Sequence, residues 1–230
     1  MPVYIDTHNH VGLTEVSEDL EAFAQKCREA GIRSGVITTG TVKDFERVSQ
    51  VAQKLHWGYC VGLHPLYISE DYQADLQSLK EFLTTHLDDE YLVGIGEIGL
   101  DFYVEGLNRV NQEKVFEAEL QLAQSFNLSV SVHSRRALYR VMALMGRYPE
   151  VRGALHAFSG SSEELKQALK RGYFLGFGGA MTYSGSKRVR QAALLCPQDR
   201  LLLETDSPDM APSFSETGHS SSLFLPRYLE

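Results

Sequence analysis

Residues 3–10 read Val-Tyr-Ile-Asp-Thr-His-Asn-His, an apolar run that ends in two histidines spaced two apart. Alternate side chains of an extended strand point to the same face, so His8 and His10 can reach one ion from the end of one strand. Neutral imidazole is a ligand for zinc, nickel, iron and copper, and for manganese when carboxylates join it. The H-x-H pair alone fits either a metal-binding pair or two surface histidines. The other motifs of the chain are needed to distinguish these interpretations.

The same pattern returns four times along the chain. Each time, a short apolar run that is typical of a buried parallel strand leads into a possible metal ligand. The runs 91–96, 128–132, 151–155 and 201–205 lead into Glu97, His133, His156 and Asp206. A chance origin for all four placements is improbable. Because the carboxyl ends of barrel strands meet at one face, the pattern predicts one shared metal site in a hydrolase.

Length and composition are those of one α/β barrel: the chain has 230 residues, 43% of them hydrophobic, and such a barrel typically takes about 250 residues. Strands are expected at 3–6, 34–38, 58–61, 91–95, 128–132, 151–155, 173–176 and 201–204, and helices at 17–30, 42–55, 72–86, 109–126, 135–147, 161–170 and 186–195. Eight alternating units favour closure of a parallel sheet into a (β/α)8 TIM barrel. We predict a single domain over residues 1–230 with a shortened or altered eighth helix, and a simple loop at the serines 220–222.

Cysteine usage and charge limit the compartment and the partners. Cys27, Cys60 and Cys196 form no C-x-x-C pair and are expected as small buried residues in a reducing compartment. The N-terminus shows neither a signal peptide nor a membrane span, so a cytoplasmic location without a membrane partner is expected. No obligate protein partner is evident. A net charge of −8 argues against broad electrostatic binding of nucleic acid. Cations bound in the cleft would add local positive charge, so a phosphodiester remains a possible substrate.

Seven segments along the chain form a set of motifs: Asp6-Thr-His-Asn-His10, Gly62-Leu-His-Pro65, Gly94-Ile-Gly-Glu-Ile-Gly-Leu-Asp-Phe-Tyr103, Val132-His-Ser-Arg135, His156-Ala-Phe-Ser-Gly160, Gly176-Phe-Gly-Gly179 and Leu203-Glu-Thr-Asp-Ser-Pro208. In this order they resemble the TatD-type metal-dependent deoxyribonucleases of the wider amidohydrolase-like barrel superfamily. Together they span nearly the whole chain, which is far more specific than any one motif.

The resemblance implies a centre of two divalent ions, such as Mg, Mn or Zn. In it His8 and His10 hold one ion, His133 and His156 hold the other, and Glu97 bridges. Asp206 completes the shell of the first ion and takes the proton from the attacking water, so Glu97 and Asp206 are the expected catalytic residues. This agrees with two-metal chemistry, in which ions about 3.5 to 4 Å apart clamp the attacking and leaving oxygens.

Other matching positions each have a functional and a structural interpretation. His64 resembles a phosphate-side histidine or orders its loop, and Arg135 pairs with a phosphate or forms a salt bridge at a helix start. Glu204 orients a ligand histidine or is a buried structural carboxylate. Asp101 and Tyr103 order the loop over the cleft, with Tyr103 toward the substrate, or they merely pack it.

Two groups of residues near these motifs are given structural roles. The glycines of the segment 176–179 lack the lysine and hydroxyl of a nucleotide loop, so they are expected to let backbone pass close beneath the site. The aromatic side chains of Tyr139 and Phe174 are expected in the core, because most such residues are buried.

The leading hypothesis is metal-assisted hydrolysis of a phosphodiester, namely the trimming of DNA from an end by a metal-activated water. A second hypothesis keeps the site but assigns a small ester, lactone or amide as substrate. A third is a metal-binding barrel without turnover. The segment Glu216-Thr-Gly-His-Ser-Ser-Ser favours this third hypothesis, because it replaces the basic, asparagine-containing segment usual after the last strand of the family.

Overall fold

A sheet of parallel strands forms the centre of the molecule in the computed structural model, which describes residues 2–13 and 19–229. Within these ranges the strands pair in the order of the sequence, each parallel to the next. They are β1 (Tyr4–Asn9), β2 (Ile32–Thr39), β3 (Gly58–Val61), β4 (Leu92–Asp101), β5 (Ser129–Arg135), β6 (Gly153–Leu155), β7 (Phe174–Phe177) and β8 (Leu201–Leu203). This is the strand order that the sequence predicts.

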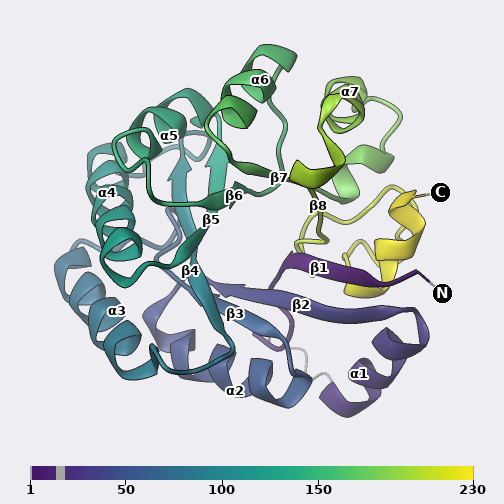
Figure 1. Cartoon of the computed structure of the whole chain (residues 1–230), viewed down its shortest axis with the longest axis horizontal. Coiled ribbons are helices and arrows are strands. Elements are labelled where there is room, and N and C mark those ends of the chain that lie inside the picture. The colour runs from purple at the N-terminus through teal and green to yellow at the C-terminus, as the bar shows by residue number, and fades with distance from the viewer. Residues whose placement is uncertain (1, 14–18, 230) are drawn as a thin grey trace.

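Helices follow the strands and surround the sheet (Figure 1). They are α1 (Leu20–Glu29), α2 (Phe45–Leu55), α3 (Tyr72–His86), α4 (Arg109–Phe126), α5 (Leu138–Met145), α6 (Ser162–Lys170) and α7 (Lys187–Leu195), with short 3-10 turns η1 (Val42–Asp44), η2 (Gly179–Thr182) and η3 (Gln198–Arg200). The expected start of the first helix at residue 17 lies outside the described residues. The helix expected at 135–147 begins later, because Arg135 still pairs with Asp101 in the sheet.

Backbone hydrogen bonds beyond the end of β8 close the sheet into a barrel. The N–H of Asp206 donates to the carbonyl of His8 at 2.9 Å, and the N–H of His10 donates to the carbonyl of Ser207 at 2.8 Å. The last strand is thereby joined to the first. The fold is the predicted (β/α)8 barrel, and this closure brings two of the candidate ligand segments side by side.

Buried aliphatic side chains fill the interior of the barrel and the layer beneath the helices. Ile37, Ile95, Val132 and Leu175, from four different strands, are each 0% exposed. Both faces of these strands are covered, which explains why their sequences show little polar alternation. Truncation of one such side chain to alanine typically costs about 2–5 kcal/mol of stability.

Two helix ends show the local signals that the sequence carries. Before α6, the hydroxyl of Ser161 accepts the N–H of Glu164 at 3.3 Å, and the Glu164 carboxylate accepts the N–H of Ser161 at 2.7 Å. This reciprocal pair satisfies two donors that the first helical turn leaves free. After α1, Gly31 takes a left-handed backbone with φ 83°, the conformation that glycine allows at a helix end.

The C-terminal segment takes the place of an eighth α-helix. The 3-10 helix η4 (Ser222–Leu229) lies beside β1 (Figure 1), and it contains Pro226, which has no N–H for an α-helical hydrogen bond. The hydroxyl of Ser222 donates to Asp6 at 2.6 Å, and that of Ser220 donates to the carbonyl of Thr205 at 2.9 Å. Ser220 and Ser221 lie in the expected loop, whereas Ser222 begins η4, and these hydrogen bonds anchor the tail.

The two aromatic residues expected in the core lie elsewhere. Tyr139 of α5 is 79% exposed, so the prediction for this residue is wrong. Phe174 of β7 is half-buried, and the guanidinium of Arg200 lies 5.0 Å from its ring centre. The burial habits of a residue type do not say which face of a short helix it occupies.

The cysteines are buried as expected, with exposed fractions of 2% for Cys27, 4% for Cys60 and 7% for Cys196. Burial raises the pKa of the Cys60 thiol to about 12, which leaves it protonated and unreactive at neutral pH.

In the ranges 2–13 and 19–229, no helix combines the length and the apolar character that a bilayer crossing requires.

One carboxylic acid of α4, Glu119, is fully buried. Its Oε1 accepts the N–H of Leu63 at 2.7 Å, while its Oε2 has no hydrogen-bond partner within the described part of the chain. Burial raises the pKa of Glu119 well above its ordinary value, and the bond from Leu63 offsets this only in part. Burial therefore favours the protonated, neutral form of this side chain in the folded protein.

We predict that Glu119→Gln makes the protein less sensitive to alkaline pH. The unfolded wild type releases this proton above about pH 4.5 while the folded protein keeps it, so wild-type stability falls as pH rises toward the higher folded pKa. Glutamine keeps the acceptor for Leu63 and has no proton to release. Thermal denaturation should give the variant a Tm advantage that is larger at pH 8 than at pH 5. A constant difference would show that Glu119 is ionised in the folded state.

Candidate metal centre

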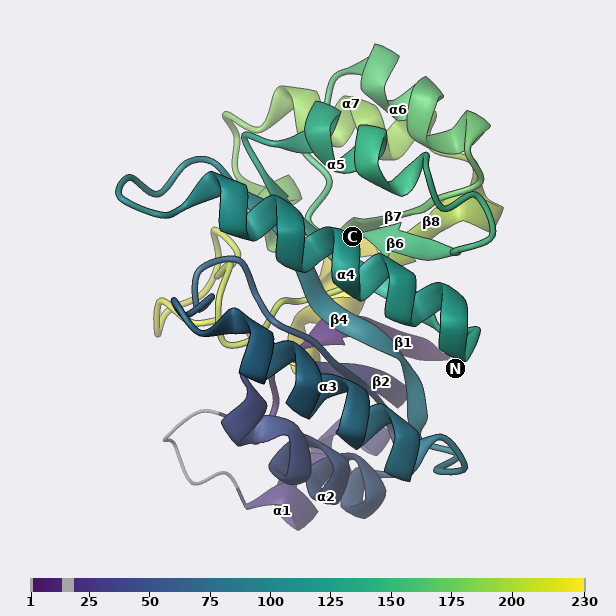
Figure 2. The ribbon, with the colours of Figure 1, turned by 90° about the vertical axis from the view of Figure 1, so that its left-hand side faces the viewer.

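The candidate ligands meet at the carboxyl ends of the barrel strands. Figure 2 shows the loops after β4 and β8 at the same end of the barrel, opposite the N-terminus. The structure brings all six expected ligands together there, and four of them are nearly inaccessible to solvent: His8 is 1% exposed, Glu97 4%, His156 5% and Asp206 8%. The strands β1 and β4 run past their predicted ends, so His8 and Glu97 lie within strands and not in the loops after them.

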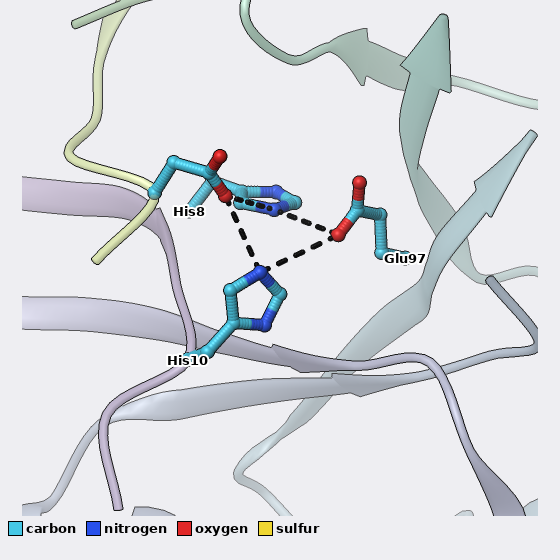
Figure 3. Close-up of side chains that lie close together, drawn as sticks. His8, His10 and Glu97 are labelled. Carbon is cyan, nitrogen blue, oxygen red and sulfur yellow. Dashed lines mark ion pairs between the residues drawn. The ribbon is translucent and has the colours of Figure 1, made fainter. Parts of the chain in front are cut away.

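The first group consists of His8, His10, Glu97 and Asp206. The Nε2 atoms of both histidines lie 3.4 Å from Oε2 of Glu97. Figure 3 marks both ion pairs with dashed lines. They also lie 3.4 Å and 3.3 Å from Oδ1 of Asp206. One donor atom from each residue falls within 4.8 Å of all the others. This set of two imidazoles and two carboxylates suits a divalent transition metal.

The other oxygen of Glu97 faces a second group of imidazoles. Its Oε1 lies 2.9 Å from Nδ1 of His133, 2.9 Å from Nε2 of His156 and 3.2 Å from Nε2 of His64. Glu97 therefore presents one oxygen to each group, which is the geometry of a bridging carboxylate.

Hydrogen bonds to the far ring nitrogens determine which histidines can act as ligands. Nδ1 of His10 lies 2.8 Å from the carbonyl of Thr38 and must donate there, so the neutral ring keeps a lone pair on Nε2. Nε2 of His133 lies 3.2 Å from the Asp101 carboxylate, which likewise leaves Nδ1 with a lone pair. Both lone pairs face Glu97, as ligands of a shared ion would.

His64 has the opposite arrangement. Its Nδ1 accepts the N–H of Leu66 at 3.2 Å, so in the neutral ring the proton is on Nε2, facing Glu97. The bond from Leu66 orders the loop, which was the structural interpretation. The Nε2–H is a donor aimed into the site, which suits an anionic oxygen better than a cation. Contact with Glu97 itself was not expected from the sequence.

The electrostatics of the cluster favour a bound cation. Burial alone would lower the pKa of His10, but Asp206 and Glu97 outweigh it and raise this pKa to about 9. Burial opposes ionisation of Glu97 too, yet the imidazoles of His64 and His156 hold its pKa well below the ordinary value. The carboxylates are thus ionised, and imidazole protons balance them. Metal binding at histidine sites releases such protons, so a divalent ion fits this donor set.

Asp101 orders its loop, which was the functional interpretation from the sequence, and it also contacts a candidate ligand. Besides facing His133, its carboxylate accepts the N–H groups of Tyr103 at 2.8 Å and Val104 at 3.1 Å. It therefore orients an imidazole and orders the loop after β4 at the same time.

Glu204 reaches the site less directly than expected. Its Oε1 lies 3.7 Å from Nδ1 of His156, beyond hydrogen-bonding distance, and accepts the N–H of Ala157 at 2.5 Å instead. Nδ1 of His156 has no hydrogen-bond partner among the described residues. Glu204 thus fixes the backbone that carries His156 and faces its ring across a short gap.

Arg135 and Tyr103 lie together at the rim of the site. The guanidinium of Arg135 lies 3.8 Å from the centre of the Tyr103 ring, and that of Arg136 lies 4.6 Å from it. No carboxylate within residues 2–13 and 19–229 forms an ion pair with Arg135. The alternative of a salt bridge at a helix start is therefore wrong for Arg135.

Two residues that orient the histidines have no marker in the sequence. Thr38 binds His10, and the hydroxyl of Ser131 lies 2.8 Å from Nδ1 of His8. Both are ordinary strand residues, and only the barrel register places them behind the ligands. Arg136 next to Arg135 also lacked a local signal.

The chain is similar to known proteins over nearly its whole length. A family model described as TatD related DNase matches residues 5–228. A metal-dependent hydrolase of Haemophilus influenzae is 33% identical over 224 residues, which cover 94% of this chain and 84% of that protein. The 3'-5' ssDNA/RNA exonuclease TatD of Pantoea ananatis is 33% identical over 228 residues, covering 94% and 85%.

Solved structures give the same result. The crystal structure of the TatD homologue YjjV from Escherichia coli has a TM-score of 0.91 and 29% sequence identity, covering 97% of this chain and 86% of that one. Sequence and fold agree with the arrangement of histidines and carboxylates at the barrel mouth. The chain therefore belongs to the TatD-related DNase family and is a metal-dependent hydrolase.

Proposed function

We propose that the protein trims single-stranded nucleic acid from an end by hydrolysing phosphodiester bonds with two divalent ions. The observation that carries this proposal is the position of Glu97, which offers one oxygen to each of two groups of imidazoles. The similarity to an ssDNA/RNA exonuclease of Pantoea ananatis supports the choice of substrate. Contact with nucleic acid would be transient, and the buried cysteines support a cytoplasmic site of action.

The hydrogen bonds at the ring nitrogens of His10, His64 and His133 support the ligand assignment. We assign His8, His10 and Asp206 to the first ion and His133 and His156 to the second, with Glu97 between them. His64 is assigned to the substrate phosphate, because its Nε2–H is a donor. A cavity of about 450 Å³ supports this placement, since it is lined by His10, His64, Glu97, Arg135 and Asp206.

When bound, the ions would stabilise charge on the phosphoryl oxygens and lower the pKa of a water. Burial opposes ionisation of Asp206, but the hydrogen bond from His10 and the charge of His156 lower its pKa. Its carboxylate is therefore ionised and can accept the proton of the attacking water. His64 and Arg135 would hold the phosphate, with Tyr103 packed against the guanidinium of Arg135.

A second candidate function keeps this centre but changes the bond. A cavity of about 450 Å³ also fits a small ester, lactone or amide, and the net charge of −8 does not favour long polyanions. Turnover of carbonyl esters without turnover of DNA would favour this candidate. Metal binding without either activity would leave the barrel as a metal-binding protein.

Gly176 and Gly178 pack closely against Glu204, which supports a role of Glu204 in positioning His156. A Cβ added at Gly176 would overlap the carboxylate of Glu204, and one added at Gly178 would overlap its carbonyl. These glycines let the chain pass closely beneath the site, as the sequence predicts.

Removal of the bridging carboxylate should abolish turnover. We expect the wild type to shorten a single-stranded oligonucleotide with magnesium or manganese, and Glu97→Ala to be at least about a hundredfold slower. Glu90→Ala, an exposed glutamate just before β4, is the matched control and should keep full activity. Product lengths on a denaturing gel measure the rate. No hydrolysis by the wild type with any of several metals would remove the nuclease proposal.

Metal binding can be measured without turnover. A ligand that binds only the folded state raises its stability, so manganese should raise the Tm of the wild type and of Glu90→Ala. Glu97→Ala should lose most of this shift, since both groups share its carboxylate. Equal shifts in all three proteins would place the ion elsewhere.

Gly176→Ala should reduce activity by displacing Glu204 from Ala157. Because residues behind a metal ligand typically matter by about 10- to 100-fold, we expect a loss of that order in kcat/KM. Gly185→Ala is the control, since a Cβ there meets nothing within 4 Å. Circular dichroism should confirm that both variants are folded. Unchanged kinetics in folded Gly176→Ala would contradict the positioning role of Glu204.

A further inference from the structure

A second cleft, of about 660 Å³, opens beside the metal centre, over the segments that follow β5 and β6. Its lining includes Tyr103, Arg136, Tyr139 and Arg188, none of which faces Glu97. Arg135 lines both this cleft and the cavity in front of the metal centre. The cleft is therefore a lateral extension of the site, adjacent to the position assigned to the reacting phosphate.

The lining of the cleft has an excess of positive charge, because it contains four arginines and one carboxylate, Glu164, whose hydrogen-bond partner is Ser161. Arg135, Arg136 and Arg188 are exposed, and none of them has a carboxylate partner among the residues that the structure describes. By contrast, Arg140 of the same lining is bound to Glu113 at 2.6 Å and 2.8 Å. In a chain of net charge −8, three unpaired arginines around one depression favour an anionic ligand.

Flat side chains accompany these charges. The Tyr103 ring, 45% exposed, carries the guanidinium groups of both Arg135 and Arg136. Arg136 has a left-handed backbone, φ 54°, which residues with a side chain rarely adopt. Tyr139 is 79% exposed at the cleft edge. Aromatic rings and guanidinium planes are surfaces on which nucleic-acid bases stack.

The start of α5 adds hydrogen-bond donors. Its first residues, Leu138 to Arg140, line the cleft, and Ala137 before them supplies no side-chain cap. The first N–H groups of a helix have no partner within the helix, and they bind phosphate readily. The arginines and this helix start thus offer phosphate contacts beside stacking surfaces.

We propose that this cleft holds the nucleotide next to the scissile phosphate of a single strand. Arg136 and Arg188 contact its backbone phosphates, and Tyr139 stacks on its base. The assignment rests on the proposed function, since it places the scissile phosphate at the metal centre. It selects a single strand because a paired base, stacked within a duplex, cannot present its face to Tyr139.

Equilibrium binding tests the cleft separately from hydrolysis. The probe is fluorescein-labelled oligothymidylate of eight nucleotides, bound to the full chain in EDTA, which stops turnover, and measured by fluorescence anisotropy. Arg136→Ala should raise Kd about fivefold and reduce the slope of log Kd against log salt by about 0.7, the value for one phosphate contact in a single strand. Tyr139→Ala should raise Kd about five- to tenfold through lost stacking and leave the slope unchanged.

Arg33→Ala is the matched control, because Arg33 is an exposed arginine at the opposite end of the barrel, at the start of β2. It should leave Kd and slope unchanged. An equal loss in Arg33→Ala, or no loss in Arg136→Ala and Tyr139→Ala, would overturn the proposal. Thymidine monophosphate binding as tightly as the oligonucleotide would also overturn it, in favour of a small phosphorylated ligand.

Binding and turnover together separate the two proposals. Binding with the expected variant pattern, but no DNA hydrolysis with any metal, supports the cleft and removes the nuclease function. If the wild type hydrolyses DNA and both cleft variants bind the oligonucleotide with unchanged affinity, the nuclease function stands. The proposal that the cleft binds a nucleotide is then rejected.

Discussion

The arrangement at the barrel mouth depends on one buried anion, the carboxylate of Glu97, which is 4% exposed. A charge removed from water is costly unless partners compensate it closely. Here imidazoles from separate parts of the chain surround both oxygens, so the same contacts that hold the anion also bring the ligands together. Protonated histidines would repel one another at these short distances. A bound divalent ion would replace their protons and still compensate the carboxylate charge.

Much of this centre could be predicted from the sequence because a parallel barrel turns sequence order into spatial convergence. Short apolar runs mark the strands, and the residues that directly follow each strand lie at one face of the barrel. The roles of individual nitrogens could not be predicted in this way. His64 and His10 look alike in the sequence. Only their partners Leu66 and Thr38, fixed by tertiary structure, leave the neutral ring of His64 with a donor at Nε2 and that of His10 with a lone pair there.

The surface around the centre was harder to predict for the same reason. The helix α5 begins three residues later than the apolar pattern indicates, since Arg135 stays in the sheet. That shift leaves Arg136 in a loop and Tyr139 on the outer face of a short helix. The net charge of −8 was also a poor predictor of nucleic-acid binding. A protein with an acidic net charge can still have a locally basic cleft beside its site.

The hydrogen bond from Ser222 to Asp6 joins positions 216 residues apart. Contacts of such long sequence separation form late, because a large loop must be closed first. During synthesis, His8 and His10 leave the ribosome early, but the strand that carries them cannot be locked to the tail until residue 222 has been added. The nascent chain therefore lacks Asp206, and with it the complete set of candidate ligands, for most of its translation.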